Sequence, residues 1–215
     1  MKKKNKIWIY PLILMGFVTI ITSSCKKDKD DLPPVLVTIG QSYQGGVVAY
    51  ILRPGDNGYD VNVQHGLIAA SSDLSTSAKW GCDGTALSGA DGTAIGTGNK
   101  NTIDIMNGCS ESGIAARLCG DLVLAGYSDW YLPSKDELAR LYENRVAVGG
   151  FASAYYWSST EFNNLSAWRQ NFVNGNQYSN VKHYPGYVRA VRDFKQTIFS
   201  ENLSASAKAL IGFLS

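Results

Sequence analysis

Charge is scarce in this chain of 215 residues, and neither sign dominates. Asp, Glu, Lys and Arg make up 18% of the sequence, and the formal net charge is +2. Four of the basic residues are clustered at the N-terminus, namely Lys2, Lys3, Lys4 and Lys6. The rest of the chain holds 16 basic and 18 acidic residues, a net charge of −2. Because nucleic-acid binding calls for a basic face or stripe, we expect no nucleic-acid partner.

The sequence also lacks an apolar run that is long enough for a permanent transmembrane helix. The run over residues 7–22 has 16 residues, whereas a helix needs about 20 to cross a bilayer. It follows the N-terminal lysines and leads into small residues and Cys25, which is the layout of a secretory signal. The small residues before Cys25 resemble a bacterial lipoprotein lipobox, which implies cleavage before Cys25 and lipidation of it. A soluble secreted protein that is cleaved nearby is the alternative.

The predicted organisation has four parts. A lipoprotein signal peptide spans 1–24, a lipid-anchored charged linker 25–37, one domain 38–194, and a C-terminal tail or docking helix 195–215. The linker is too polar to pack, and its acidic cluster looks like the surface-export signal of some Gram-negative lipoproteins. We therefore expect a lipid-anchored protein of the outer membrane that is exposed at the surface. The tail carries apolar residues at helical spacing, namely Leu203, Ala207, Leu210, Ile211 and Leu214.

Cysteine and histidine are too few for most metal and hydrolase sites. Beyond Cys25, the chain contains Cys82, Cys109, Cys119, His65 and His183. Their spacing matches no zinc pattern, and neither Gly-x-Ser-x-Gly nor a phosphate-binding Gly-Lys-Ser/Thr motif is present. In an exported protein, we expect one disulfide. Cys109 and Cys119 are the closest pair in sequence, and Cys82 with Cys109 is equally allowed.

The stretch from Trp80 to Asn99 holds six glycines and predicts a long ordered loop or a hairpin. Asp83 and Asp91 within it have the ligand type for a calcium site, but oxygen-rich glycine loops are also common as bare turns. We therefore expect no bound metal and no cofactor.

Hydrophobic periodicity predicts strands first and helices in the middle of the chain. Residues 47–52 and 66–70 are apolar runs typical of strands. Short helices are expected from Asn101 or Thr102 and over 114–122. The sequence from Ser134 to Glu137 is a capping box that predicts a longer helix. Its apolar face would carry Leu138, Leu141, Tyr142 and Val146, and Gly149-Gly150 would end it.

The last third of the domain changes to a strand period. Four strands are expected, over 155–160, 167–173, 177–182 and 187–191. Asn174-Gly175 is the dipeptide that a type I′ hairpin turn requires, because both central residues need positive φ. The predicted fold class is α+β with a C-terminal antiparallel meander.

Four segments carry a resemblance to a known family. They are GGVVAY at 45–50, DWYLPSKDEL at 129–138, YWSSTE at 156–161 and YVRAVR at 187–192. In this order they closely resemble the Lcl C-terminal domain family, which is named after a Legionella collagen-like adhesin, over about residues 45–194. Leu-Pro-Ser-x-x-Glu, Trp-Ser-Ser and the closing Val-Arg strand are also remotely similar to formylglycine-generating enzymes. The resemblance implies a single C-type-lectin-like domain on a bacterial surface. In the named adhesin this domain binds sulfated polysaccharide.

The chemistry implied by these resemblances is only partly present. The enzymes would need a pair of copper-binding cysteines near the end of the fold, and no cysteine follows Cys119. Calcium-dependent sugar binding would need Glu-Pro-Asn or Gln-Pro-Asp, and neither occurs. We expect a non-catalytic domain with no catalytic residues. The family signature residues are expected to be structural; they are Trp130, Leu132, Pro133, Ser134, Glu137, Trp157, Ser158, Ser159, Arg189 and Arg192.

Ligand contact is expected in the last third of the domain, where aromatic rings, amides and cations mix. Residues 165–195 hold five basic residues and one acidic residue. The candidates are Trp168, Arg169, Asn171, Asn176, Lys182, Tyr184 and Arg189, groups that stack on sugars and bind hydroxyls or sulfates. The bland alternative is a solvated meander whose aromatic residues pack inward.

The function that we expect is that of an adhesin-like surface lipoprotein. Its partners would be the membrane, through the lipid anchor, and carbohydrate, including sulfated glycans, or another surface molecule. The alternative is a structural or assembly protein of the outer membrane that acts through protein-protein contacts. Oligomerisation is left open.

Overall fold

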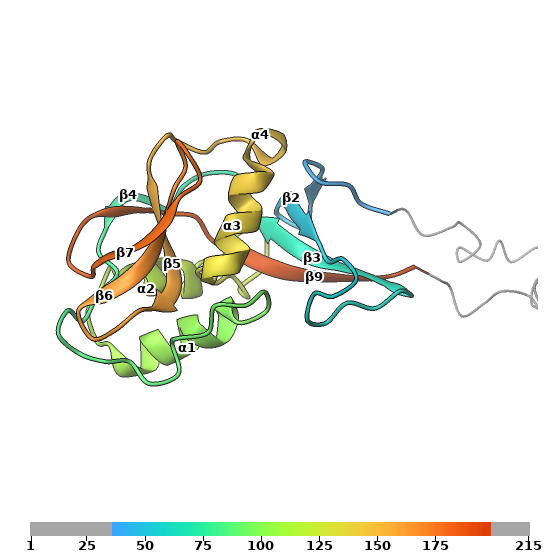
Figure 1. Cartoon of the computed structure of the whole chain (residues 1–215). Helices are drawn as coiled ribbons and strands as arrows, with labels where there is room; N and C mark the ends of the chain where they lie inside the picture. Colours follow the sequence, from blue (N-terminus) through green and yellow to red (C-terminus); the bar gives the residue numbers. More distant parts are fainter. Residues whose placement is uncertain (1–35, 199–215) are drawn as a thin grey trace, which may run out of the picture. The chain divides into compact units, whose positions relative to one another are not determined.

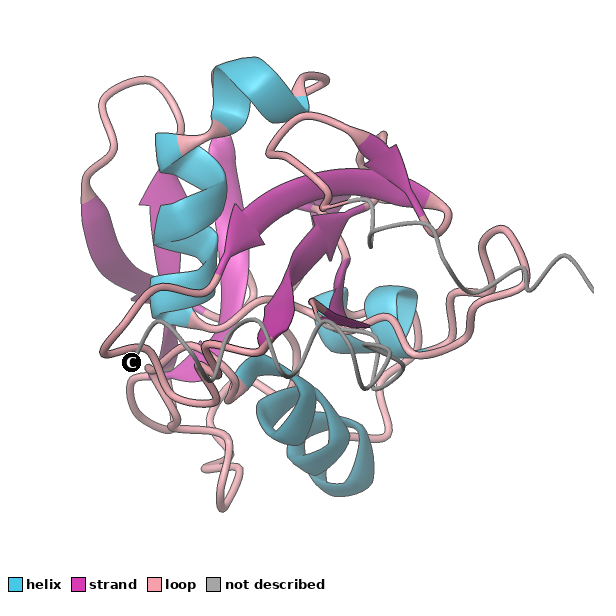
Figure 2. Cartoon of the chain, turned by 90° about the vertical axis from the view of Figure 1, so that its right-hand side faces the viewer, coloured by secondary structure: helices cyan, strands magenta, loops and turns pink. Residues whose placement is uncertain are grey.

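The computed structural model describes residues 36–198, so the predicted leader, most of the linker and the predicted tail helix lie outside the described residues. The strands are β1 Ser42–Tyr43, β2 Gly46–Ile51, β3 Val63–Ala69, β4 Ser75–Ala78, β5 Tyr155–Glu161, β6 Ser166–Asn171, β7 Gln177–Val181, β8 Gly186–Val188 and β9 Val191–Thr197. The helices are α1 Gly98–Gly108, α2 Ala115–Gly120, α3 Lys135–Glu143 and α4 Arg145–Val148. The predicted α+β class is confirmed as a mixed domain with two sheets and four short helices (Figures 1 and 2). None of the helices within residues 36–198 is long and apolar enough to cross a membrane.

The two sheets lie on either side of α3 (Figure 1). The first sheet has the order β1-β2-β3-β9, and all its pairs are antiparallel. The second has the order β4-β8-β5-β6-β7, in which β5 and β8 are parallel. Leu138 and Leu141 of α3 share a buried cluster with Tyr50 and Leu67 of the first sheet and with Tyr156 of the second. The helix therefore supplies the core that joins the sheets.

A second buried cluster lies on the other side of β5, beside α1 and α2. It contains Trp80, Ile105 of α1, Cys119 of α2 and Trp157 of β5. Trp157 and Tyr156 enter different clusters because successive strand residues point to opposite faces. Both faces of β5 are therefore buried, which explains its run of apolar and small residues.

The predicted strand over 187–191 is in fact two strands in different sheets. β8 ends at Val188 and pairs with β4 and β5, and β9 begins at Val191 and pairs with β3. The expected four-stranded meander is therefore wrong, and only β5, β6 and β7 form one. The reason is packing around Trp157. Gly186 lies so close to the Trp157 indole that a Cβ would collide with it, which places β8 beside β5 and not beside β7.

The predicted type I′ turn at Asn174-Gly175 is also wrong. Gly175 has a φ of +81°, but Asn174 is not among the residues with positive φ. β6 ends at Asn171, and the connection to β7 is longer than two residues. Within this connection, the Asn171 side-chain oxygen accepts a hydrogen bond from the Val173 N–H. Phe172 explains the difference, because it is 4% exposed and packs in the α3 core. Burying this ring takes the chain out of strand register before the Asn-Gly pair.

The capping box of α3 is confirmed, but one residue of its predicted face is not buried. The Ser134 hydroxyl accepts from the Glu137 N–H, and the Glu137 carboxylate accepts from the Ser134 N–H. The helix ends at Asn144, whose side chain donates to the Ala49 carbonyl of β2. After this break α4 is rotated, so Val146 is 86% exposed and Val148 is buried.

Helix α1 begins at Gly98, earlier than the predicted start at Asn101 or Thr102. Asn101 and Thr102 lie within the first turns of α1, and both side chains are buried. Asn101 Nδ2 donates to the Gly92 carbonyl, and the Thr102 hydroxyl donates to the Gly98 carbonyl. A Cβ at position 98 would collide with the Glu137 carboxylate. The glycine thus allows the first turn of α1 to pack directly against the start of α3.

The disulfide joins Cys82 to Cys109, with a Cα–Cα distance of 5.8 Å. The pairing of Cys109 with Cys119 is therefore wrong, and the alternative that the spacing allowed is the correct one. Cys119 is a free, fully buried thiol on the core face of α2. It is near Cys109 in sequence, but its side chain points into the core, whereas Cys82 lies in the loop that reaches the end of α1.

Candidate functional site

The predicted ligand residues of β6 lie on opposite faces of the second sheet. Trp168 and Arg169 are adjacent in β6, and adjacent strand side chains point to opposite faces. Trp168 lies on the side of α3, where the Lys135 ammonium is 4.0 Å from the centre of its ring. Arg169 lies on the other side, directly across from Tyr178 of β7. The predicted residues therefore do not form one binding surface.

Lys182 does not face solvent, so its predicted role in ligand binding is wrong. The side chain has no exposed surface, and Nζ lies 2.5 Å from Glu161 Oε1. Nζ also donates to the Thr85 carbonyl at 2.7 Å and lies 4.7 Å from the centre of the Trp80 ring. Both Glu161 oxygens in turn accept from the Leu87 N–H. This ion pair thus ties the glycine-rich loop to the second sheet.

Arg189 is buried as well, which corrects its predicted role as a ligand residue. It is 1% exposed and lies where the chain crosses from β8 to β9. Its Nε donates to Asp73 Oδ1 at 2.7 Å, and its two terminal nitrogens donate to the carbonyls of Ala70 and Gly150. The guanidinium satisfies backbone carbonyls at a place where the strand hydrogen bonding is interrupted.

Most of the basic excess over residues 165–195 is neutralised by ion pairs within the protein. Arg192 forms two hydrogen bonds with the Asp129 carboxylate, at 2.7 and 2.8 Å. This pair holds the pKa of Asp129 below its ordinary value. With Lys182 and Arg189 also paired, three of the five basic residues have carboxylate partners. Arg169 and Lys195 are the two that remain.

Arg169 forms a cluster with two tyrosines on the face of the second sheet that is turned away from α3. We call Tyr155, Arg169 and Tyr178 the outer cluster. The guanidinium carbon lies 4.3 Å from the Tyr155 ring centre and 4.9 Å from that of Tyr178. Among residues 36–198, no carboxylate lies within ion-pair distance of Arg169. Tyr155 is 41% exposed. Arg169 itself is half-buried, and its Nε has no contact with solvent. The outer cluster therefore presents a partly exposed cation that has no ion-pair partner among the described residues and that lies against two aromatic rings.

Trp168 belongs to a different surface, at the turn between β5 and β6. Its ring contacts Phe162 edge-on at a centroid distance of 5.5 Å, in addition to Lys135. Phe162 is 54% exposed, and Leu165 in the same turn is 53% exposed. This apolar turn is separate from the outer cluster.

The other predicted ligand residues lie in the loops at the two ends of β7. Asn171 and Asn176 are joined by a backbone hydrogen bond at the β6–β7 connection. Tyr184 is 48% exposed and packs its ring on that of His183 after β7. Asn171 is cross-strand from Tyr155, so it is the nearest of these three to the outer cluster.

Asp83 and Asp91, the possible calcium ligands of the glycine-rich loop, do not belong to a group of described side chains that could surround a metal ion. Asp83 lies 2.6 Å from His183 Nδ1. Within the described range, one group of side chains could place its ligand atoms around a single metal ion: Cys82, Cys109 and Glu111. Cys82 and Cys109 are joined in the disulfide, so their sulfur atoms are not thiolate ligands.

The model of the Lcl C-terminal domain matches residues 70–192, which is more than half of the chain. The chain belongs to the Lcl C-terminal domain family. No curated protein matches it. The match includes α1 to α4 and β4 to β8, whereas β1, β2 with its GGVVAY segment, and β3 precede it and most of β9 follows it.

The signature residues of this Lcl C-terminal domain all lie in its interior. The ten residues from Trp130 to Arg192 that the sequence suggested as structural are each buried. Trp80 Nε1 donates to the Ser158 carbonyl, the Ser158 hydroxyl donates to the Trp168 carbonyl, and the Ser159 N–H donates to the Pro133 carbonyl. The signatures therefore connect loops to strands and are not exposed to a ligand.

Glu137 is the central residue of this internal network. Its two oxygens accept from the N–H groups of Gly96 and Ser134, each at 2.7 Å. The side chain has no exposed surface. Burial raises the pKa of Glu137 to about 7, although these hydrogen bonds favour the charged form. Glu137 thus fastens the glycine-rich loop to the start of α3.

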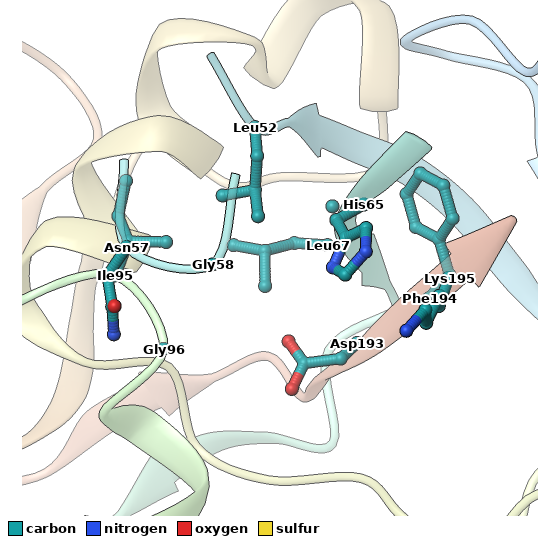
Figure 3. A pocket seen from close by; sticks show the side chains of 11 residues that line it. Leu52, Asn57, Gly58, His65, Leu67, Ile95, Gly96, Asp193, Phe194 and Lys195 are labelled. Atoms are coloured by element: carbon teal, nitrogen blue, oxygen red, sulfur yellow. The ribbon is translucent and has the colours of Figure 1, made fainter. Parts of the chain in front are cut away.

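The described part of the chain also holds a cavity that lies mostly outside the residues matched by the family model and that contains none of the ligand residues predicted from the sequence. This cavity of about 360 Å³ lies over β3 and β9, lined in part by His65, Leu67 and Asp193 (Figure 3). The alternation of His65 with Leu67 marks one face of a strand. The sequence offers no signal that pairs this strand with one that lies about 130 residues later, as the His65–Lys195 register requires.

Proposed function

We propose that this Lcl C-terminal domain is displayed on the bacterial outer surface and binds carbohydrate through the outer cluster, without catalysis. The observation that carries the proposal is the Arg169 guanidinium, which lies against the Tyr155 and Tyr178 rings and has no carboxylate partner within residues 36–198. Arginine is suited to carboxylate and sulfate, because its planar fork forms two parallel hydrogen bonds. The ligand would then be a sugar with one acidic group at the site.

The charge distribution argues for a single acidic contact and against a long polyanion. Lys182, Arg189 and Arg192 are engaged in ion pairs within the domain, so they do not add to the field around Arg169. A ligand that meets one free cation shows only modest dependence on salt.

The C-type-lectin-like fold is part of this proposal; it rests on the resemblance of the Leu-Pro-Ser-x-x-Glu and Trp-Ser-Ser segments. An experimental structure whose strand order differs from that of C-type-lectin-like domains would contradict this part of the proposal.

Replacing Arg169 with alanine is expected to lower the affinity for acidic glycans by about tenfold or more, because a hydrogen-bonded charge contact contributes about 1.5–3 kcal/mol. The full-length protein in detergent would be tested on an array of neutral, uronic-acid and sulfated glycans. Arg169→Lys should retain part of the binding, since it keeps the charge and loses the fork.

Lys135→Met is the matched control for this prediction. It removes one positive charge from the opposite face of the same sheet, beside Trp168. Its binding should equal that of the wild type. Equal losses for the two variants would indicate a general charge effect and would count against the outer cluster as the site.

Lipid attachment at Cys25 is the second part of the proposal. Cells that express the wild-type chain should incorporate labelled fatty acid into it, and Cys25→Ser should abolish the label and leave the protein out of the outer-membrane fraction. Cys119→Ser is the control, because that thiol is buried in the core. Label that persists in the Cys25 variant would contradict lipidation at this residue.

Protein-protein contact through the β5–β6 turn is the second candidate function. The exposed side chains of Phe162 and Leu165 favour it, because exposed apolar groups that lie in one turn are typical of protein interaction surfaces. If the array shows no glycan binding, this candidate takes first place. It predicts that replacing both residues with serine abolishes a contact that Arg169→Ala leaves intact.

A further inference from the structure

The cavity over the first sheet lies between the β3–β9 pair and two loops. Leu52, Asn57 and Gly58 come from the loop after β2, Ile95 and Gly96 from the glycine-rich loop, and the floor from β3 and β9 (Figure 3). Its volume of about 360 Å³ is in the range of small-molecule sites, which are about 300–1,000 Å³. None of the seven residues predicted to contact ligand lines it.

The cavity wall is mainly apolar and carries one carboxylate. Leu52, Leu67 and Ile95 form the apolar part, and the Asp193 carboxylate points into the space beside them (Figure 3). Leu67 and Asp193 are directly opposite each other on β3 and β9. This is the arrangement of a small-molecule site, with an apolar enclosure and few polar groups that fix orientation.

The Asp193 carboxylate forms no ion pair with another described residue. Oδ1 accepts a hydrogen bond from the Tyr131 hydroxyl at 2.6 Å. Within residues 36–198, no lysine, arginine or histidine lies within ion-pair distance of it, although His65 and Lys195 line the same cavity. Asp193 is exposed, yet the surrounding protein atoms displace part of the water from its carboxyl group and raise its pKa. The nearby Asp129 also raises it, whereas the Tyr131 hydrogen bond and the charges of Arg192 and His65 act in the opposite direction.

We propose that this cavity binds a small organic ammonium ion with an apolar body. The ammonium would donate to Asp193, and Leu52, Leu67 and Ile95 would enclose the apolar part. Charge complementarity favours this class over a neutral or anionic ligand, because an anion would face Asp193 directly. A neutral alcohol of the same shape would keep the apolar contacts and lose the ion pair.

Lys195 is the internal competitor for Asp193. It is two residues away on the same face of β9, directly across from His65, and exposed. A lysine that is free to move could partly neutralise the carboxylate when the cavity is empty. Lys195→Met should therefore bind the ammonium ion at least as tightly as the wild type, whereas loss of the Asp193 charge should abolish the preference for a cation.

Benzylamine and benzyl alcohol are a matched pair of probes. The isotope-labelled full-length protein in detergent would be titrated with each, and amide chemical shifts would be followed by NMR. We expect saturable shifts at residues 65–67 and 193–195 with benzylamine, and binding of benzyl alcohol that is weaker by about tenfold or more. Asp193→Asn should reduce the benzylamine affinity to that of the alcohol.

Three results would overturn the proposal: no saturable shift at the cavity, equal binding of the two probes, or full binding of benzylamine by Asp193→Asn. The amide oxygen of that variant can still accept the hydrogen bond from Tyr131, and an unchanged midpoint of thermal unfolding would show that the variant is folded. The site shares no residue with the outer cluster, so Arg169→Ala should leave benzylamine binding unchanged. Failure of one proposal is thereby distinguished from failure of the other.

Discussion

Replacing Lys182 with methionine should lower the free energy of unfolding by about 3–5 kcal/mol, because it leaves a largely buried carboxylate without its counter-ion. Glu161 is 9% exposed and Lys182 is fully buried. Methionine keeps the apolar contact with Trp80, so the loss reports on the charge and on the hydrogen bond to the Thr85 carbonyl. Denaturant unfolding monitored by tryptophan fluorescence would measure it.

The double variant Lys182→Met with Glu161→Gln separates the ion pair from other effects. The amide introduced by Glu161→Gln is neutral, and its oxygen could still accept from the Leu87 N–H, which Glu161 now binds with both oxygens. The double variant should therefore be more stable than Lys182→Met alone, since no unpaired charge stays buried. Additive losses would show that the two residues act independently and would contradict this account.

The pH dependence of stability should carry a contribution from Glu137 of about 3 kcal/mol. Burial raises the pKa of Glu137 to about 7 in the folded protein, from an ordinary value of 4.5. A carboxyl group whose pKa is raised by folding binds its proton more tightly in the folded state. Its stabilising contribution is complete below pH 4.5 and is lost as the pH rises to 7. Unfolding free energies across this range would show the change.

Glu137→Gln isolates this contribution, because the amide does not titrate. The variant should be less stable than the wild type at acid pH. The two Glu137 oxygens accept from the N–H groups of Gly96 and Ser134, and the amide nitrogen of the variant cannot accept one of these hydrogen bonds. As the pH rises through 7, the free energy of unfolding of the variant should increase by about 3 kcal/mol relative to that of the wild type. Leu138→Ala, in the same helix and facing the core, should show a loss that does not change with pH. A constant difference for Glu137→Gln would mean that folding does not raise the pKa of Glu137, which would contradict this account.

Local patterns of sequence were reliable where neighbouring residues alone determine the structure. The capping box at Ser134 and Glu137 predicted the start of α3 correctly, because its two hydrogen bonds join residues three apart. Gly149 and Gly150 have positive φ, but they end α4, whereas the helix that they were expected to end stops at Asn144. The strands at 47–52 and 66–70 correspond to β2 and β3 with small shifts at their ends.

Predictions failed where a distant residue changes the local preference. Asn174-Gly175 favours a two-residue turn, but burial of Phe172 against the α3 core lengthens the connection. Val146 continues the helical spacing, but Asn144 ends α3 by bonding to β2, which no periodicity shows. Cys109 and Cys119 are ten residues apart, yet the disulfide goes to Cys82, because distance in space determines pairing.

The candidate site shows the same division. The sequence identified Arg169 within a group of cations and aromatic residues, and it could not tell that Lys182 and Arg189 point inward. Residue type and local charge are the same for an exposed lysine and for one that is paired with Glu161, which is 21 residues away. The cavity beside Asp193 was missed for a similar reason, since its walls come from four separate segments.

By itself, the sequence determined the family, the α+β class, and the position of most strands and of α3, because these depend on short motifs and on the spacing of apolar residues. Only the tertiary structure decided which cations reach solvent, which cysteines pair, where the chain passes from one sheet to the other, and that a cavity exists. Each of these depends on contacts between segments far apart in the chain, and the free energy of burying a charge or a ring at such a contact outweighs the local preference.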